Sequence, residues 1–295
     1  MDTSFLCECW VTPLLSLVTL GGIYYLIWKN SKEKRGTKNL ERLEEFEKLI
    51  REVGIVHNEG LEHIYESLKL KKTTLSKENI IYIIKDSTIS FIESHSFFKS
   101  DENKELKEIV YENFRNTDTN DCLGYNIKNA LQKKYLEYID KTISMYDDVN
   151  VIIRVLDNIR HLDFKNFNME DRYVVISSVE IAKASISYWN NNYYKWEKLL
   201  IADEENLQTK KEYDLKTEGV KNKRKEGWFK WKDVGRCDIK GAANGTISFG
   251  IKAAIIPSTG GLLALGATIA AGAISSSAVS AGEQLIDRFR TTRKK

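Results

Sequence analysis

Residues 241–282 have the sequence GAANGTISFGIKAAIIPSTGGLLALGATIAAGAISSSAVSAG, which has the most unusual composition in the chain. Lys252 is the only charged residue among them, and Gly, Ala and Ser dominate. Small residues four apart on a helix leave a flat groove, so a second helix can approach closely. We therefore predict a helical hairpin with helices at about 241–256 and 261–282, joined by a Pro- and Gly-containing turn at 257–261.

The predicted packing surface of this hairpin consists of glycines in a glycine-zipper pattern: Gly241, Gly245, Gly266, Gly272 and Gly282. Each of these glycines lies four residues from another small residue, in the pairs Gly241–Gly245, Gly266–Ala270, Gly272–Ser276 and Ala278–Gly282. Small residues four apart are frequent where membrane helices pack. Gly and Ala are weakly hydrophobic, however, and Asn244 and Lys252 are costly at bilayer depth. Three alternatives are therefore open. The segment inserts into a membrane as a hairpin, it packs as a hairpin in a soluble core or against a second copy of the chain, or it is a disordered tail.

A second apolar stretch, WVTPLLSLVTLGGIYYLIW at 10–28, contains no charged residue and is long enough to cross a bilayer as a helix. Its ends carry aromatic residues that suit the membrane interface, namely Trp10, Tyr24, Tyr25 and Trp28. Five basic residues and one Glu follow at 29–38, so the positive-inside rule places the bulk of the chain in the cytoplasm. We expect a bacterial inner-membrane protein. One alternative, a cleaved signal peptide, lacks a basic start and a cleavage site, and the other is a buried helix of a soluble protein.

Residues 29–202 show the three- and four-residue spacing of apolar side chains that is typical of amphipathic helices. Pro occurs only at positions 13 and 257, which permits long helices. We therefore expect an all-α fold, with an antiparallel bundle in this region. Gly54 is predicted to end one helix and Ser76 to cap the next. The Ile-rich run after Ser76 is also compatible with a strand, but no neighbouring run offers a partner.

Residues 203–227 are highly charged and are predicted to form an exposed linker or helix extension. The segment 228–295 begins with WFKWK, in which aromatic residues alternate with lysines. This pattern suits the membrane interface, so Trp228 and Trp231 are predicted as further anchors. The alternative is a helix end that docks its aromatic residues on the bundle. The expected division of the chain is thus 1–28, 29–202, 203–227 and 228–295.

The sequence contains no motif that is typical of an enzyme. It lacks a GxxxxGK[ST] phosphate loop, a GxSxG elbow and a CxxC pair. His57 and His63 are six residues apart, so they do not share a helix face as a metal-binding pair would. The net charge is only +3, and no basic stripe indicates nucleic-acid binding. We expect no catalytic residue, cofactor or metal, and four reduced cysteines.

Two further motifs suggest functional hypotheses. The sequence His57-Asn58-Glu59-Gly60 is interpreted either as a helix cap with a closely packed glycine or as a partner-binding turn. The aromatic cluster at 188–196 is interpreted either as core or as a binding surface for a partner. Its members are Tyr188, Trp189, Tyr193, Tyr194 and Trp196.

Three stretches resemble parts of a loose group of helical bacterial proteins, best represented among the Bacteroidetes. They are GIVHNEGLEHIYESL at 54–68, SISYWNNNYYKW at 185–196 and WFKWKDVGRCDIKGAANGTISFG at 228–250. The group has no established activity, so the resemblance implies a bacterial setting and no catalytic residues. The tail is also similar in composition to the Gly/Ala-rich helices of small membrane-active bacteriocins.

Two functional classes follow, and neither is an enzyme. In the first, the chain is membrane-active: the C-terminal hairpin inserts into the bilayer or oligomerises there, and the bundle controls when. Its partners are then the lipid bilayer and further copies of the chain. In the second, the chain is a membrane-anchored scaffold or protein-interaction module, and the hairpin only packs against other helices.

Overall fold

The computed structural model describes residues 41–72, 75–98, 103–115, 129–160, 167–200, 229–253 and 259–292. The chain divides into two compact units, Met1–Glu47 and Lys48–Lys295. In the first unit the described residues, 41–47, are helical. The predicted transmembrane helix at 10–28 lies outside the described residues. Every regular element in the described part of the chain is a helix, which confirms the predicted all-α fold class.

The second unit begins within a helix at 41–70 and contains all the elements that follow it. These are α2 (Lys77–Ser94), α3 (Asn103–Arg115), α4 (Ala130–Met145), α5 (Val149–Arg160), α6 (Met169–Glu197), the short 3-10 helix η5 (Lys198–Leu200), α8 (Trp231–Ala253) and α9 (Thr259–Thr292). The Ile-rich run after Ser76 is helical, as predicted, and Ser76 is its N-cap residue. The backbone N–H of Ser76 donates to Asn79 Oδ1 at 2.7 Å, which closes this cap.

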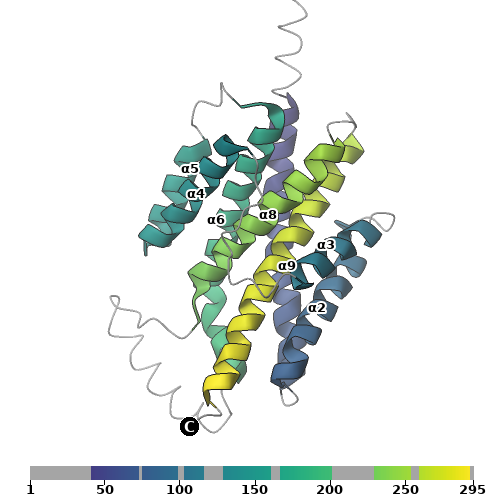
Figure 1. Ribbon diagram of the computed structural model, residues 1–295, viewed down its shortest axis with the longest axis vertical. Coiled ribbons are helices and arrows are strands. Elements are labelled where there is room, and N and C mark those ends of the chain that lie inside the picture. Colours follow the sequence, from purple (N-terminus) through teal and green to yellow (C-terminus); the bar gives the residue numbers. More distant parts are fainter. Residues whose placement is uncertain are drawn as a thin grey trace, which may run out of the picture. The chain divides into compact units, whose positions relative to one another are not determined.

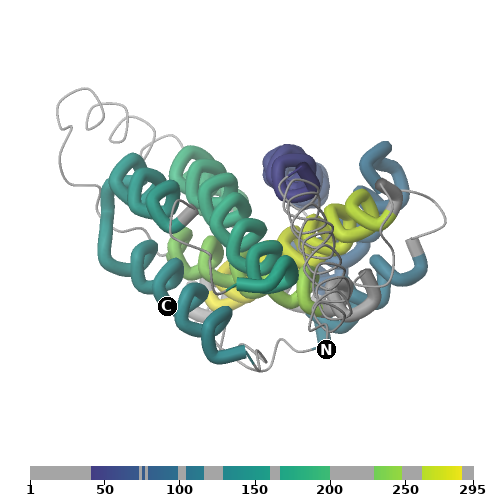
Figure 2. The backbone as a smooth tube through the Cα atoms, turned by 90° about the horizontal axis from the view of Figure 1, so that it is seen from above, coloured from purple at the N-terminus to yellow at the C-terminus, as the bar shows by residue number. Residues whose placement is uncertain are grey.

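The α8–α9 hairpin forms the middle of the Lys48–Lys295 unit. The most extensive contact between elements joins α8 to α9; α8 also packs on α6 and α4, while α9 packs on α2 and α3 (Figure 1). A second direction shows the same order, with the green and yellow hairpin between the teal and blue helices (Figure 2). The C-terminal helices that the sequence sets apart by composition thus lie in one compact unit with the bundle helices.

A hydrophobic core fills the space between α4, α5, α6 and α8. Buried members come from each helix, for example Ile139, Leu156, Val175 and Ile239. Burial of each such aliphatic side chain stabilises the fold by roughly 1.5–3 kcal/mol. The helical spacing of apolar residues therefore has a direct cause: α4 and α5 turn one face inward towards α6 and the hairpin.

Gly54 does not end a helix, and this prediction is wrong. The helix at 41–70 continues through Gly54 and Gly60. A Cβ atom on Gly54 would lie 3.0 Å from the Cβ of Ala184 in α6, and one on Gly60 would lie 2.8 Å from Ile274 Cδ1 in α9. Both glycines therefore permit close helix packing. Asn58 does not cap a helix either, because it lies in the middle of this one and its Nδ2 donates to the Ala184 carbonyl at 3.3 Å.

Two further expectations need correction. Helix α9 begins at Thr259, so Gly260 and Gly261 lie in its first turn and not in the predicted reversal at 257–261. Pro257 restricts the residue before it and leaves the residues after it free to be helical. Cys237 is disulfide-bonded, so the expectation of four reduced thiols is wrong at this position.

Candidate functional site

The contact between α8 and α9 is made by backbone against backbone. A Cβ atom on Gly241 would lie 2.3 Å from the carbonyl oxygen of Gly272 and 2.6 Å from Ser276 Oγ. A Cβ atom on Gly245 would lie 2.8 Å from the carbonyl oxygen of Thr268. No L side chain fits at these distances. The two helices therefore approach as closely as they do only because Gly241, Gly245 and Gly272 lack side chains.

The other two glycines of the zipper pattern face different helices. A Cβ atom on Gly266 would meet the side chain of Leu49 at 3.1 Å, and one on Gly282 would meet Ile84 Cδ1 at 2.6 Å. Gly266 thus lies against the helix at 41–70, and not between the hairpin helices as expected. Gly282 lies against α2. The reason is that small residues occur all around α9, and neighbours approach it from several sides.

Hydroxyl groups on α9 are tied to the neighbouring helices by hydrogen bonds. Asn113 of α3 donates from Nδ2 to Ser275 Oγ at 2.6 Å. Trp189 of α6 donates from Nε1 to Ser277 Oγ at 3.2 Å, and both residues are fully buried. These bonds fix the rotation of α9 about its axis, because a turned helix would leave buried donors without acceptors.

A buried polar cluster joins α8 to α6 and to the helix at 41–70. Asp238 Oδ2 accepts a short hydrogen bond from Ser185 Oγ and lies 3.4 Å from His57 Nε2. His57 and Asp238 have no exposed side-chain surface. The other ring nitrogen, His57 Nδ1, is 2.9 Å from Asn58 Oδ1. Nearby, Ser177 Oγ and Thr246 Oγ1 lie 2.9 Å apart and add a second link between α6 and α8.

The residue types in this cluster match those of a nucleophilic triad, but the arrangement differs. In a triad, the histidine lies between the serine and the carboxylate. Here, Asp238 lies between Ser185 and His57, and all three side chains are buried. Asp238 Oδ1 and His57 Nε2 also have no hydrogen-bond partner. The cluster therefore links three helices, and Ser185 and His57 meet through Asp238 and not through a direct hydrogen bond.

Ion pairs hold the start of α8 against α4 and the α4–α5 turn. Arg236 binds Asp140 through two hydrogen bonds, one of which joins Nη2 and Oδ2 at 3.0 Å. This contact raises the pKa of Arg236. Lys232 pairs with Asp147, and its hydrogen bond lowers the pKa of that carboxyl group. Two-point recognition of a carboxylate by arginine is geometrically specific, so Arg236 orients α8 on α4.

Most of the aromatic cluster at 188–196 belongs to the core. Trp189 and Trp196 are fully buried, with ring centroids 5.1 Å apart, whereas Tyr194 is 44% exposed. The Tyr188 hydroxyl donates to Glu62 Oε2 at 3.3 Å and accepts from Trp196 Nε1 at 3.2 Å. Burial raises the pKa of the Tyr188 phenol well above its usual value.

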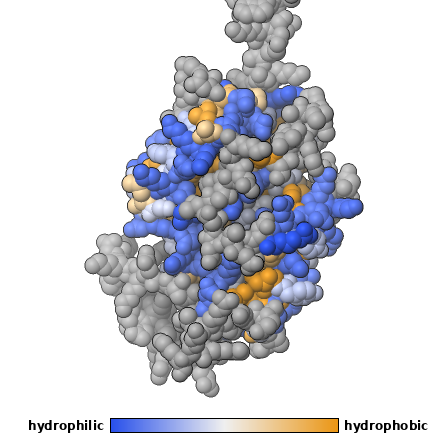
Figure 3. Space-filling view, in the orientation of Figure 1, coloured by the Kyte–Doolittle hydropathy of each residue, from blue (hydrophilic) through white to orange (hydrophobic). Residues whose placement is uncertain are grey.

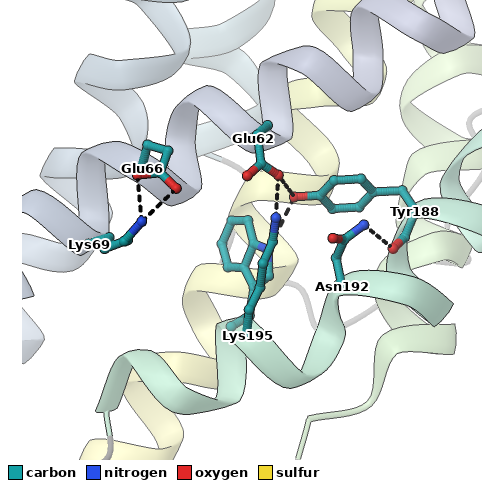
Figure 4. A network of polar contacts seen from close by, with 7 residues as sticks. Glu62, Glu66, Lys69, Tyr188, Asn192 and Lys195 are labelled. Carbon is teal, nitrogen blue, oxygen red and sulfur yellow. Dashed lines mark hydrogen bonds and ion pairs between the residues drawn. The ribbon is translucent and has the colours of Figure 1, made fainter.

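Glu62 is the centre of a polar network between the helix at 41–70 and α6 (Figure 4). It pairs with Lys195 of α6 and accepts the hydrogen bond from Tyr188. The Lys195 ammonium also lies 4.5 Å from the centre of the Tyr65 ring, a cation–π contact. Glu62 is half-exposed and Lys195 is mostly buried, so the network seals the edge of the aromatic core.

Of the six aromatic residues predicted as membrane anchors, the structure describes Trp231. This residue lies at the first position of α8, is partly buried and packs against the core between α4, α5 and α6. Its neighbour Phe229 is buried, with its ring centroid 5.3 Å from that of Trp189. Trp10, Tyr24, Tyr25, Trp28 and Trp228 lie outside the described residues.

Helix α9 contains the one segment among the described residues that is long and apolar enough to cross a membrane, Gly261–Asp287. Its mean hydropathy is 1.8, but 78% of its apolar window is buried inside the protein. The described residues on the face in Figure 3 are mostly hydrophilic, with smaller apolar patches between them. Central helices of soluble domains have the same length and composition, so the burial of α9 is the informative observation.

The described residues contain no group of three His, Cys, Asp or Glu side chains placed to hold a metal ion. No family model, curated protein or solved structure matches this chain.

Proposed function

We propose that this chain is a membrane-anchored, non-enzymatic scaffold or protein-interaction module in which the C-terminal hairpin is the internal core. The observation that carries the proposal is the burial of α9 between α8, α2 and α3. A helix that only needs to be apolar gains nothing from oriented hydrogen bonds. The bonds of Ser275 to Asn113 and of Ser277 to Trp189 favour a permanent place in the bundle.

The membrane anchor in this proposal is the apolar segment at 10–28. It is free of charge and flanked by aromatic and basic residues. Helix α8 is a poor second span, because Asp233, Arg236, Asp238 and Lys240 lie in its first half. If the hairpin crossed a bilayer twice, these four charged side chains would lie within the hydrocarbon region, where charges are costly.

Two features favour opposite sides of the membrane for the bundle. The basic residues at 29–38 favour the cytoplasm of a bacterium, as expected from the sequence. The disulfide bond at Cys237 favours an oxidising compartment. Because Cys237 is buried, cells are first quenched with acid and the chain is denatured; maleimide labelling of Cys237 with and without a reductant then decides between the two. Labelling without reductant supports the cytoplasm.

A second candidate function is membrane activity, in which the bundle opens and releases the hairpin. The specific observation in its favour is the length and hydropathy of Gly261–Asp287. Release of the hairpin would break the buried cluster around Asp238 and the hydrogen bonds of Ser275 and Ser277. This function therefore requires a trigger that supplies the free energy lost with these contacts. The membrane-active candidate predicts dye release from liposomes, and the scaffold proposal predicts none.

A cross-link between α3 and α9 in the membrane-bound, full-length protein tests the proposal. Asn113→Cys and Ser275→Cys replace two side chains that are in direct contact. We expect mild oxidation to join these cysteines in native membranes, as identified by mass spectrometry. Asn113→Cys with Asp287→Cys, an exposed residue about three turns further along α9, is the control pair. A cross-link that forms in detergent and is absent in membranes would favour release of the hairpin.

A further inference from the structure

A groove of about 490 Å³ runs between the outer faces of α4 and α5. Tyr135 and Tyr138 of α4 line it together with Val155 and Ile159 of α5, so its floor is aromatic and aliphatic. The Tyr138 ring is 49% exposed. Ile159 is buried, while Tyr135 and Val155 are half-buried. Ile159 and Tyr135 also belong to or pack against the core between α4, α5, α6 and α8, so the groove is an opening at the edge of that core in which Tyr138 and Val155 are the added apolar lining.

The rim of the groove has unbalanced positive charge. Lys134 and Lys141 line it, are exposed, and form no ion pair or hydrogen bond within the described part of the chain. They are seven residues apart on α4, which is about 10.5 Å along the helix axis. Tyr138 lies between them on the same face. The groove therefore presents two free ammonium groups on either side of an exposed aromatic ring.

The acidic residues around the groove are already engaged by other basic groups. Glu137 lies 3.9 Å from Lys133, and Asp157 lies 2.7 Å from Lys183 of α6. Asp140 and Asp147 bind the two basic residues at the start of α8. Glu137 also lines the groove, so its lining carries two lysines and one carboxylate, and neither Lys134 nor Lys141 is paired with a carboxylate of the described residues.

We propose that this groove binds an acidic amphipathic helix of a partner protein. A helix laid along α4 and α5 places apolar residues at i, i+3, i+4 and i+7 on the floor. Carboxylates on its flank, about two turns apart, then meet Lys134 and Lys141. A flat bilayer surface would meet the lysines but would leave the concave apolar floor unfilled, so a helix fits the shape better. This inference rests on the proposed role as an interaction module.

A charge-swap binding experiment tests this inference on full-length protein in nanodiscs of zwitterionic lipid. The probe is a fluorescent amphipathic peptide of about 18 residues, with Leu at helical spacing and Glu on both flanks. A second peptide has Lys in place of every Glu, and a third has the acidic composition without an apolar face. Fluorescence anisotropy gives Kd for each.

We expect the acidic amphipathic peptide to bind, and the other two to bind at least about tenfold more weakly. The double variant Lys134→Glu/Lys141→Glu should lose about tenfold in affinity for the acidic peptide and gain affinity for the basic one. Tyr138→Ala should weaken binding of the acidic peptide to the wild-type groove and of the basic peptide to the double variant. Lys104→Glu, an exposed charge reversal on α3, should change neither. The gain for the basic peptide also shows that the double variant is folded.

Three results would overturn the inference. The acidic peptide fails to bind, its Kd is unchanged in the double variant, or phosphatidylglycerol vesicles displace it in a manner that depends on Lys134 and Lys141. The last result would identify an anionic membrane as the occupant. None of these outcomes affects the α3–α9 cross-link. A result that contradicts peptide binding in the groove can therefore be distinguished from one that contradicts the proposed function.

Discussion

Gly241 of α8 and Gly272 of α9 face each other so closely that each occupies the space of the other's missing side chain. A Cβ atom on Gly241 would lie 2.3 Å from the Gly272 carbonyl oxygen, and one on Gly272 would lie 2.5 Å from the Gly241 carbonyl oxygen. Both obstacles are backbone atoms, which cannot rotate away as a side chain can. The distance between the hairpin helices therefore depends on these two positions more than on any bulk hydrophobicity.

Replacing either glycine by alanine should destabilise the bundle. We expect Gly241→Ala or Gly272→Ala to lower the free energy of unfolding by about 2–3 kcal/mol, because the helices must separate to admit one methyl group. Denaturant titration followed by circular dichroism measures this change. The matched control is Gly266→Ala, whose new Cβ would meet only the flexible side chain of Leu49. Alanine also gains about 1 kcal/mol in helix propensity over glycine, so the free energy of unfolding of Gly266→Ala should stay close to that of the wild type. Equal losses at all three sites would contradict this explanation.

The buried carboxylate of Asp238 should be among the most sensitive polar groups in the protein. Asp238→Ala leaves the buried Ser185 hydroxyl without its acceptor and removes the carboxyl group that lies 3.4 Å from the buried His57, so we expect a loss of about 3–5 kcal/mol in the free energy of unfolding. Asp233→Ala, on the same helix, removes a half-exposed carboxylate and should cost less than about 1 kcal/mol. Chemical denaturation of both variants provides the comparison. Similar losses in the free energy of unfolding for Asp238→Ala and Asp233→Ala would show that the buried cluster does not hold the three helices together.

Alkaline pH should weaken the fold through Tyr188. Its pKa is raised above 10.0 in the folded state because the phenol is buried. The stabilisation is therefore complete below about pH 10 and is lost as pH rises further, since the unfolded chain then releases the proton more readily. We expect up to about 1.4 kcal/mol per pH unit from this group. Tyr188→Phe should flatten the decrease between pH 9 and about pH 11, whereas Tyr82→Phe, at an exposed tyrosine, should not. Equal slopes in wild type and Tyr188→Phe would refute the assignment.

Acid pH should release the contact between Asp147 and Lys232. The folded pKa of Asp147 lies below its ordinary value of 3.8 because Lys232 donates a hydrogen bond to it. Its contribution to stability is thus present above that value and lost as pH falls through the folded pKa. Denaturation midpoints of wild type and Asp147→Asn should differ at neutral pH and converge in acid. Lys232→Gln should behave in the same way as Asp147→Asn. A difference that persists undiminished below about pH 2 would rule out this contact as its cause.

The sequence predicts the helical class well because apolar spacing records which face of each helix is buried. The Ser76 cap is equally local, since it depends on residues three apart. The close packing of Gly60 was predicted and is confirmed, whereas the role of Gly54 could not be predicted. A glycine that ends a helix and a glycine that admits a neighbouring helix both lack a Cβ atom, and only the tertiary contact with α6 or α9 distinguishes them.

The polar cluster has almost no signal in the sequence. His57 and Asp238 lie on helices far apart in the chain, and neither belongs to a local motif. One hint was available, because Asp238 is an acidic residue close to an apolar, small-residue run and therefore needs a partner if buried. The location of the hairpin was also beyond prediction. Gly and Ala at helical spacing allow close packing in lipid and in a protein core alike.

The anchor at 10–28 is the central claim, and membrane flotation of a chain that lacks residues 1–28 tests it most directly. Wild-type protein should float with membranes and resist carbonate extraction. We predict that the shortened chain remains in the soluble fraction as a folded, helical protein, because α9 stays inside the bundle. An unrelated apolar span placed before residue 29 should restore flotation. If the shortened chain still floats and resists carbonate, α9 or its surroundings enter the membrane and the account is wrong.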